Sequence, residues 1–105
     1  SKMVNSSMAD DKKRIPFSHM IYFGDGETDI PCMKIVGMFG GNPIAVYDKD
    51  SAKKKAVAQK LKRQGRVNFI TPAVYTRDSR TFAIVAAIID KIKAEDDLRL
   101  LASFK

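Results

Sequence analysis

Three short apolar runs, each followed by a stretch with helical spacing, constrain the fold of this chain more than any other feature. The runs cover residues 19–23, 44–47 and 67–70, and they lie too far apart in sequence to pair as hairpins. Parallel strands need a crossover of about a dozen residues or more, usually a helix that returns with right-handed topology. The sequence therefore predicts an α/β fold: a partial Rossmann-like, three-layer core with about three parallel strands and flanking helices.

The first predicted helix has clear signals at both ends. Thr28 or Asp29 is a suitable N-cap, and Pro31 falls in the first turn, where its missing N–H costs little. Gly37 is the expected end of the helix. Its expected apolar side consists of Pro31, Cys32, Ile35 and Val36.

The second and third helices begin at similar signals. Asp50 or Ser51 is the expected cap of a helix that stops at Gly65, and Ser79 is the expected cap of a long third helix. The acidic run at residues 95–97 interrupts the apolar pattern of that helix. Residues 95–105 therefore either continue it or form a separate terminal turn, and residues 1–14 are expected to be loop.

The first apolar run ends in an acidic turn. Asp25 follows the run directly, and Asp29 comes four residues later, at the start of a helix. Gly24 and Gly26 would let the backbone turn sharply and leave room for a ligand. Ligands of such sheets bind beyond the carboxyl ends of the strands, and two carboxylates there suit Mg²⁺. A plain Gly-Asp-Gly turn, with Asp29 only capping the helix, fits the same residues.

The segment 23–31, with its apolar strand, Gly24, Asp25 and the later Asp29, resembles the fourth conserved motif of the haloacid dehalogenase (HAD) superfamily of phosphohydrolases. The similarity extends from Pro16 to about Ile92. It implies that residues 1–105 are the C-terminal part of a HAD-like core domain, near the phosphoserine-phosphatase-like branch. Such a domain would act on a phosphorylated small-molecule substrate.

The resemblance also implies roles for the two acids and for a lysine. Asp25 would be a direct Mg²⁺ ligand, and Asp29 would be a ligand through water or an orienting group. The family has a catalytic lysine well before the acidic turn. Lys2 is the candidate for it, because Lys12 and Lys13 lie too close to the turn.

Other parts of the family pattern are absent. No apolar strand followed by Asp-x-Asp, the family's nucleophile motif, precedes Asp25, and the Ser/Thr motif and the cap are missing too. An aspartyl-phosphate cannot form without its nucleophile. We therefore expect a fragment of a Mg²⁺-dependent phosphatase that supplies the metal-binding loop but has no activity alone. Such a fragment would lack the sheet neighbour of its first strand, so we expect self-association through that exposed edge.

The positive charge of the chain suggests an alternative function. The formal net charge is +7, and much of the excess lies at residues 53–63. We interpret that segment mainly as one solvated helix face. The alternative is a non-catalytic basic α/β module that binds nucleic acid or another polyanion, with help from Arg77 and Arg80. No aromatic residues interleave with the lysines, which argues against a single-stranded nucleic acid bound by base stacking, and nucleic acid is not the expected partner.

The remaining features concern location and the two residues with reactive side chains. No apolar run approaches the roughly 20 residues that span a bilayer, and there is no signal-peptide pattern, so a cytoplasmic location without membrane contact is expected. Cys32, the single cysteine, excludes an internal disulfide and is expected in the core. His19 is expected at the entrance of the first strand rather than as a catalytic base.

Overall fold

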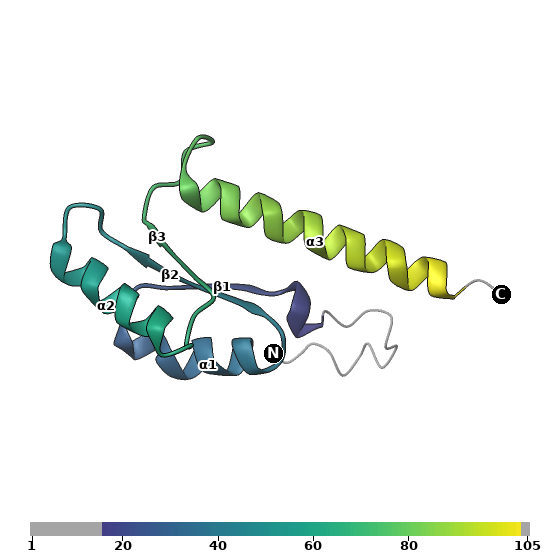
Figure 1. Cartoon of the computed structure of the whole chain (residues 1–105), viewed down its shortest axis with the longest axis horizontal. Helices are drawn as coiled ribbons and strands as arrows, with labels where there is room; N and C mark the ends of the chain where they lie inside the picture. The colour runs from purple at the N-terminus through teal and green to yellow at the C-terminus, as the bar shows by residue number, and fades with distance from the viewer. Residues whose placement is uncertain (1–15, 104–105) are drawn as a thin grey trace, which may run out of the picture.

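The structure is a computed structural model that describes residues 16–103, and it confirms the predicted α/β class (Figure 1). The loop expected at residues 1–14 and the candidate Lys2 lie outside the described residues. Three parallel strands form one sheet in the order β1-β2-β3. The strands are β1 (Ile21–Gly24), β2 (Asn42–Tyr47) and β3 (Phe69–Pro72). The helices are α1 (Ile30–Met38), α2 (Ala52–Arg63) and α3 (Arg80–Ala102), with short 3-10 turns η3 (Phe17–His19) and η4 (Glu27–Asp29).

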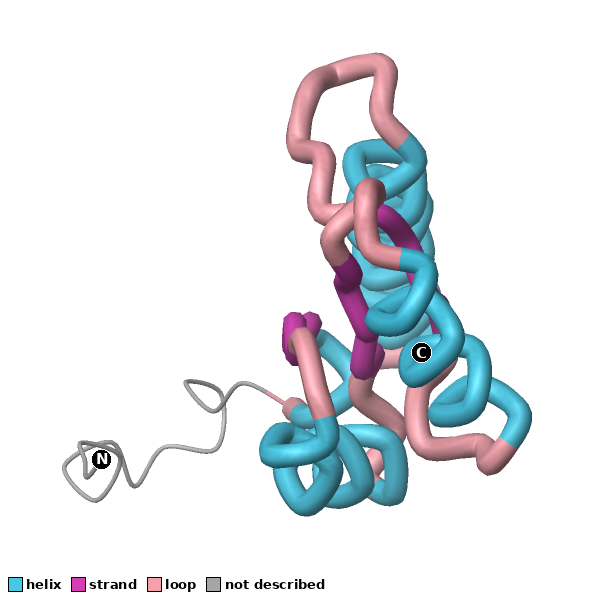
Figure 2. The backbone as a smooth tube through the Cα atoms, turned by 90° about the vertical axis from the view of Figure 1, so that its left-hand side faces the viewer, coloured by secondary structure: helices cyan, strands magenta, loops and turns pink. Residues whose placement is uncertain are grey.

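The helices cover the two faces of the sheet unequally (Figures 1 and 2). Two successive right-handed crossovers in the same direction place α1 and α2 on one face, and α3 packs on the other. The core is divided accordingly. Against α1 and α2 the buried residues are Met33, Ala45, Ala58, Leu61 and Val67. Against α3 they are Ile44, Val46, Ile84 and Ile88.

The predicted caps of α2 and α3 are confirmed. Ser51 Oγ accepts a hydrogen bond from the Lys54 N–H, and Ser79 Oγ accepts one from the Phe82 N–H, each at 3.1 Å. Gly65 ends α2 as predicted, with a left-handed φ of 72°. This conformation favours glycine because a Cβ would be strained there.

The predicted end of α1 is wrong, and its predicted apolar side is right only at Val36. Gly37 lies inside α1, which runs to Met38 with Phe39 as its C-cap, and Gly40 just beyond the cap has a left-handed φ of 86°. Met33 and Val36 are the buried residues of α1, whereas Cys32 is exposed. Met33 is fully buried and fills the space between α1 and the sheet, so Cys32 is turned towards solvent.

The first strand begins later than predicted and is less covered. His19 belongs to η3, and β1 starts at Ile21. Phe23, the last residue of the first apolar run, is 43% exposed. The reason is the position of β1 at the edge of the described sheet, where no strand lies beyond it.

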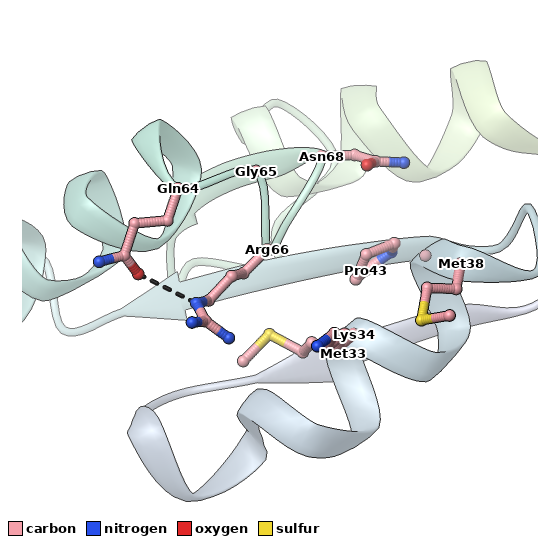
Figure 3. Close-up of a pocket in the computed structure, with 9 residues that line it drawn as sticks. Met33, Lys34, Met38, Pro43, Gln64, Gly65, Arg66 and Asn68 are labelled. Atoms are coloured by element: carbon pink, nitrogen blue, oxygen red, sulfur yellow. Dashed lines mark hydrogen bonds between the residues drawn. The ribbon is translucent and has the colours of Figure 1, made fainter.

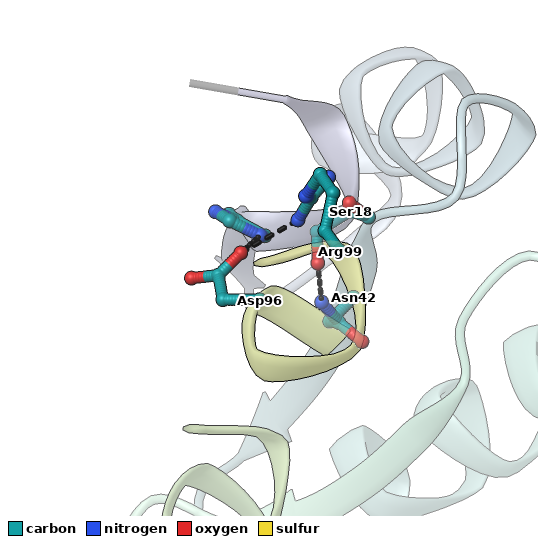
Figure 4. A network of polar contacts seen from close by, with 5 residues as sticks. Ser18, Asn42, Asp96 and Arg99 are labelled. Atoms are coloured by element: carbon teal, nitrogen blue, oxygen red, sulfur yellow. Dashed lines mark hydrogen bonds and ion pairs between the residues drawn. The ribbon is translucent and has the colours of Figure 1, made fainter. Parts of the chain in front are cut away.

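The acidic run does not break α3, which is one continuous helix to Ala102. Asp96 accepts a hydrogen bond from Arg99 at 2.6 Å and lies 3.3 Å from His19 Nε2 (Figure 4). The amide of Asn42 donates to the carbonyl oxygen of Ser18 (Figure 4) and to that of Met20, which ties η3 to the start of β2. His19 therefore lies before β1, away from Asp25. Within residues 16–103, no helix has both the length and the apolar content needed to cross a bilayer.

Candidate functional site

The acidic turn after β1 is organised around the carboxylate of Asp29. Its Oδ1 accepts a hydrogen bond from the Tyr22 hydroxyl at 2.8 Å, and its Oδ2 accepts one from the Asp25 backbone N–H at 3.0 Å. Asp29 occupies the N-cap position of α1, yet its side chain makes no capping hydrogen bond. Asp29 thus ties the turn back to β1, and Asp25 is the exposed acid of the turn.

Gly24 is required by the close approach of Asp29. A Cβ at position 24 would lie 2.8 Å from Asp29 Cβ and 3.0 Å from Met33 Cε, both shorter than ordinary contacts. Gly26 is different, because a Cβ there would meet nothing within 4 Å and its φ is not positive. The turn therefore requires glycine at position 24, whereas position 26 has space for a side chain.

The Tyr22–Asp29 hydrogen bond shifts the ionisation of both groups. It raises the pKa of Tyr22 to about 12, because loss of the proton would place a phenolate beside a carboxylate. The same bond, together with the Asp25 N–H, lowers the pKa of Asp29 below its ordinary value. Asp29 is therefore held ionised, and Tyr22 neutral, across the physiological range.

A cavity of about 380 Å³ opens at the carboxyl edge of the sheet beside this turn. Residues from the ends of all three strands line it, which is where a parallel sheet is expected to bind a ligand. Two carboxylates and two ammonium groups meet there, with one exposed aromatic ring. The lining residues are Asp25, Val46, Tyr47, Asp48, Lys49, Lys54, Ala73 and Tyr75.

Asp48 and Tyr75 belong to this cavity but are not predicted from the sequence above. Asp48 carries a usable signal, because it directly follows β2 just as Asp25 follows β1. Its Oδ1 accepts the Asp50 N–H at 2.9 Å, which leaves its second oxygen for a ligand. Tyr75 lies in the β3–α3 loop and is 63% exposed. No local pattern marks that position.

The donor set suits a hard cation that keeps part of its water shell. Among the described residues, no group of three or more His, Cys, Asp or Glu side chains gathers in a metal-binding arrangement. Asp25 and Asp48 line one cavity, and Mg²⁺ often takes only one or two protein carboxylates beside water and substrate phosphate. Asp29 is engaged through both oxygens, which fits an orienting role better than direct ligation.

Comparison with known proteins identifies no family and no relative for this chain. The chain matches no family model, no curated protein and no solved structure. The functional interpretation therefore rests on the residues, their geometry and the motif resemblance of segment 23–31.

Proposed function

We propose that this chain is part of a Mg²⁺-dependent phosphomonoester hydrolase of the HAD type and supplies its acidic metal-binding loop. The observation that supports this most strongly is the position of Asp25. It follows β1 at the carboxyl edge of the sheet, its backbone is fixed by Asp29, and it lines a cavity with a second carboxylate. This combination fits Mg²⁺ ligation by Asp25, which the resemblance of segment 23–31 to the fourth HAD motif implies.

Each polar residue of the cavity has a role in the proposal. Asp25 is the direct Mg²⁺ ligand, and Asp29 orients the loop through Tyr22 and the Asp25 N–H. Lys54 places a positive charge where a substrate phosphate would enter. Bound Mg²⁺ would neutralise charge on that phosphate and hold it against the attacking group.

The proposal assigns no nucleophile to this chain. The Asp48-Lys49-Asp50 run repeats the Asp-x-Asp spacing after β2, but Asp48 accepts the Asp50 N–H and closes a turn. It also follows the acidic loop, whereas the family pattern has the nucleophile before it. We therefore expect metal binding without turnover by these 105 residues.

The test is an assay of the chain on a panel of phosphomonoesters with and without Mg²⁺, run beside a Mg²⁺-binding titration. The proposal expects Mg²⁺ binding that depends on Asp25 and no measurable hydrolysis. Hydrolysis that survives Asp25→Asn would contradict it, and so would the absence of Mg²⁺ binding.

A second candidate function is binding of a polyanion by α2. Lys53, Lys54, Lys55, Lys60, Lys62 and Arg63 are all exposed on this helix. Such binding depends steeply on salt, because phosphate contacts release counterions. A polynucleotide titration at two salt concentrations tests it: affinity that falls steeply with salt supports this candidate, and weak or salt-independent binding removes it.

A further inference from the structure

A second cavity lies at the opposite end of the sheet, between α1 and the connection from α2 to β3 (Figure 3). Its volume is about 420 Å³. It is formed where α1 and α2 both end and where β2 begins. Pro43, which lines it, pairs with Tyr22, three residues before Asp25, so about 10 Å of strand separates the cavity from Asp25. The lining residues are Met33, Lys34, Gly37, Met38, Pro43, Gln64, Gly65, Arg66 and Asn68.

Arg66 is held in position at this cavity. Its Nε donates to Gln64 Oε1 at 3.0 Å, and its backbone N–H donates to the Leu61 carbonyl at 3.0 Å. The left-handed Gly65 fixes the turn between them. Figure 3 shows the guanidinium reaching from this turn towards α1, where Met33 and Lys34 lie. The side chain is half-buried, so its position is defined by packing as well as by hydrogen bonds.

The charge of the cavity lining is entirely positive. Lys34 and Arg66 contribute two cations, and no Asp or Glu lines the cavity. Among the side chains that the structure describes, Arg66 forms no ion pair within 4.0 Å. Its two terminal nitrogens therefore remain for a ligand, and the planar guanidinium fits a phosphate through paired hydrogen bonds.

The carboxyl ends of α1 and α2 border the same cavity. Their partial negative charges disfavour an anion, and contact with both cations would offset this effect. A doubly charged head group gains more from two such contacts than a monoanion does. Met38 and Pro43 supply an apolar wall beside the cations, which suits a ligand with an organic part.

We propose that this cavity binds an organic phosphate, with its dianionic head between Lys34 and Arg66 and its apolar part against Met38 and Pro43. The site is separate from the Asp25 cavity and does not require Mg²⁺. Ligand binding there would link α1 to the α2–β3 connection and stabilise the folded chain.

The experiment is a titration with phenyl phosphate, followed by the backbone amide shifts of isotope-labelled protein. It uses the Asp25→Asn chain without Mg²⁺, so that the proposed metal site does not contribute. Inorganic phosphate and benzoate are the comparison ligands: the first lacks the apolar part, and the second carries a single charge. We expect phenyl phosphate to bind most tightly and to shift the amides of Lys34, Gly65 and Arg66.

The matched variants are Arg66→Gln and Arg63→Gln. Both remove one positive charge near the end of α2, but only Arg66 lines the cavity. We expect Arg66→Gln to weaken phenyl phosphate binding about tenfold, and Arg63→Gln to change it less than twofold. Lys34→Gln, at an exposed position on α1, is a second variant that should also weaken binding. Equal losses in Arg63→Gln and Arg66→Gln, shifts centred on residues 46–49 or no binding would each overturn the proposal.

Discussion

The structure of the acidic turn predicts that Gly24→Ala destabilises the fold, whereas Gly26→Ala, two positions later, does not. In Gly24→Ala, the new Cβ would lie 2.8 Å from Asp29 Cβ and 3.1 Å from Asp29 Cγ, so the carboxylate must move. Overpacking of this kind costs about 1–3 kcal/mol, and each hydrogen bond that Asp29 loses adds about 1 kcal/mol. We expect the free energy of unfolding to fall by about 2–4 kcal/mol.

Gly26→Ala is the matched control. The new methyl would meet nothing within 4 Å, and the backbone conformation suits alanine. At such a site the substitution restricts the unfolded chain and stabilises by about 0.4–1 kcal/mol. Gly26→Ala should therefore be neutral or slightly more stable than the unmodified chain.

Urea unfolding followed by circular dichroism measures both free energies. The ionisation of Tyr22, followed by NMR of its ring, provides a second readout. Displacement of Asp29 should lower the pKa of Tyr22 from about 12 towards its ordinary value in Gly24→Ala, but not in Gly26→Ala. Equal stabilities of the two variants, or an unchanged Tyr22 pKa in Gly24→Ala, would refute the reasoning.

Three further predictions follow from particular contacts. The lowered pKa of Asp29 stabilises the folded chain above pH 3.8, and this contribution is lost as the pH falls. The raised pKa of Tyr22 stabilises it below pH 10.0, and this contribution is lost as the pH approaches about 12. Tyr22→Phe should therefore weaken the pH dependence of the free energy of unfolding at both the acid and the alkaline end, as measured by urea unfolding. A pH dependence equal to that of the unmodified chain would contradict this. Ser79→Ala should reduce the free energy of unfolding by about 1 kcal/mol, because the Phe82 N–H loses its cap; a change below 0.3 kcal/mol in urea unfolding would contradict the cap assignment. We propose that the edge of β1, which pairs with no strand of residues 16–103 other than β2, mediates self-association. Light scattering should therefore detect a dimer or larger species that Phe23→Lys disperses, and a monomer before substitution would exclude the proposal.

The sequence predicts the fold well because the strand–helix alternation is local. Crossover length and handedness leave few arrangements once three apolar runs alternate with helices. The cap at Ser79 and the stop at Gly65 are also local, because each depends on one residue and its immediate neighbours. The expected stop of α1 shows the limit: the sequence favours Gly37, whereas the left-handed glycine after the helix is Gly40, and only the backbone conformation distinguishes the two.

The candidate site is predicted less completely, because it depends on contacts between elements. Asp25 is identified by its position after a strand, a rule that would also have found Asp48. The hydrogen bond from Tyr22 to Asp29 cannot be predicted, because it joins a strand residue to the start of a helix through the turn geometry. The same holds for Tyr75, which reaches the cavity only through the course of the β3–α3 loop.

The central claim, that the turn after β1 holds Mg²⁺ through Asp25, is tested most directly by Mg²⁺ titration followed through backbone amide shifts. We predict shifts at residues 24–29 and 48, and an affinity that falls about tenfold or more in Asp25→Asn. Asp50→Asn is the control, because it removes the same charge from an exposed residue that does not line the cavity, and it should bind Mg²⁺ as the unmodified chain does. Equal Mg²⁺ affinity in both variants, or no Mg²⁺ binding by the unmodified chain, would contradict the claim.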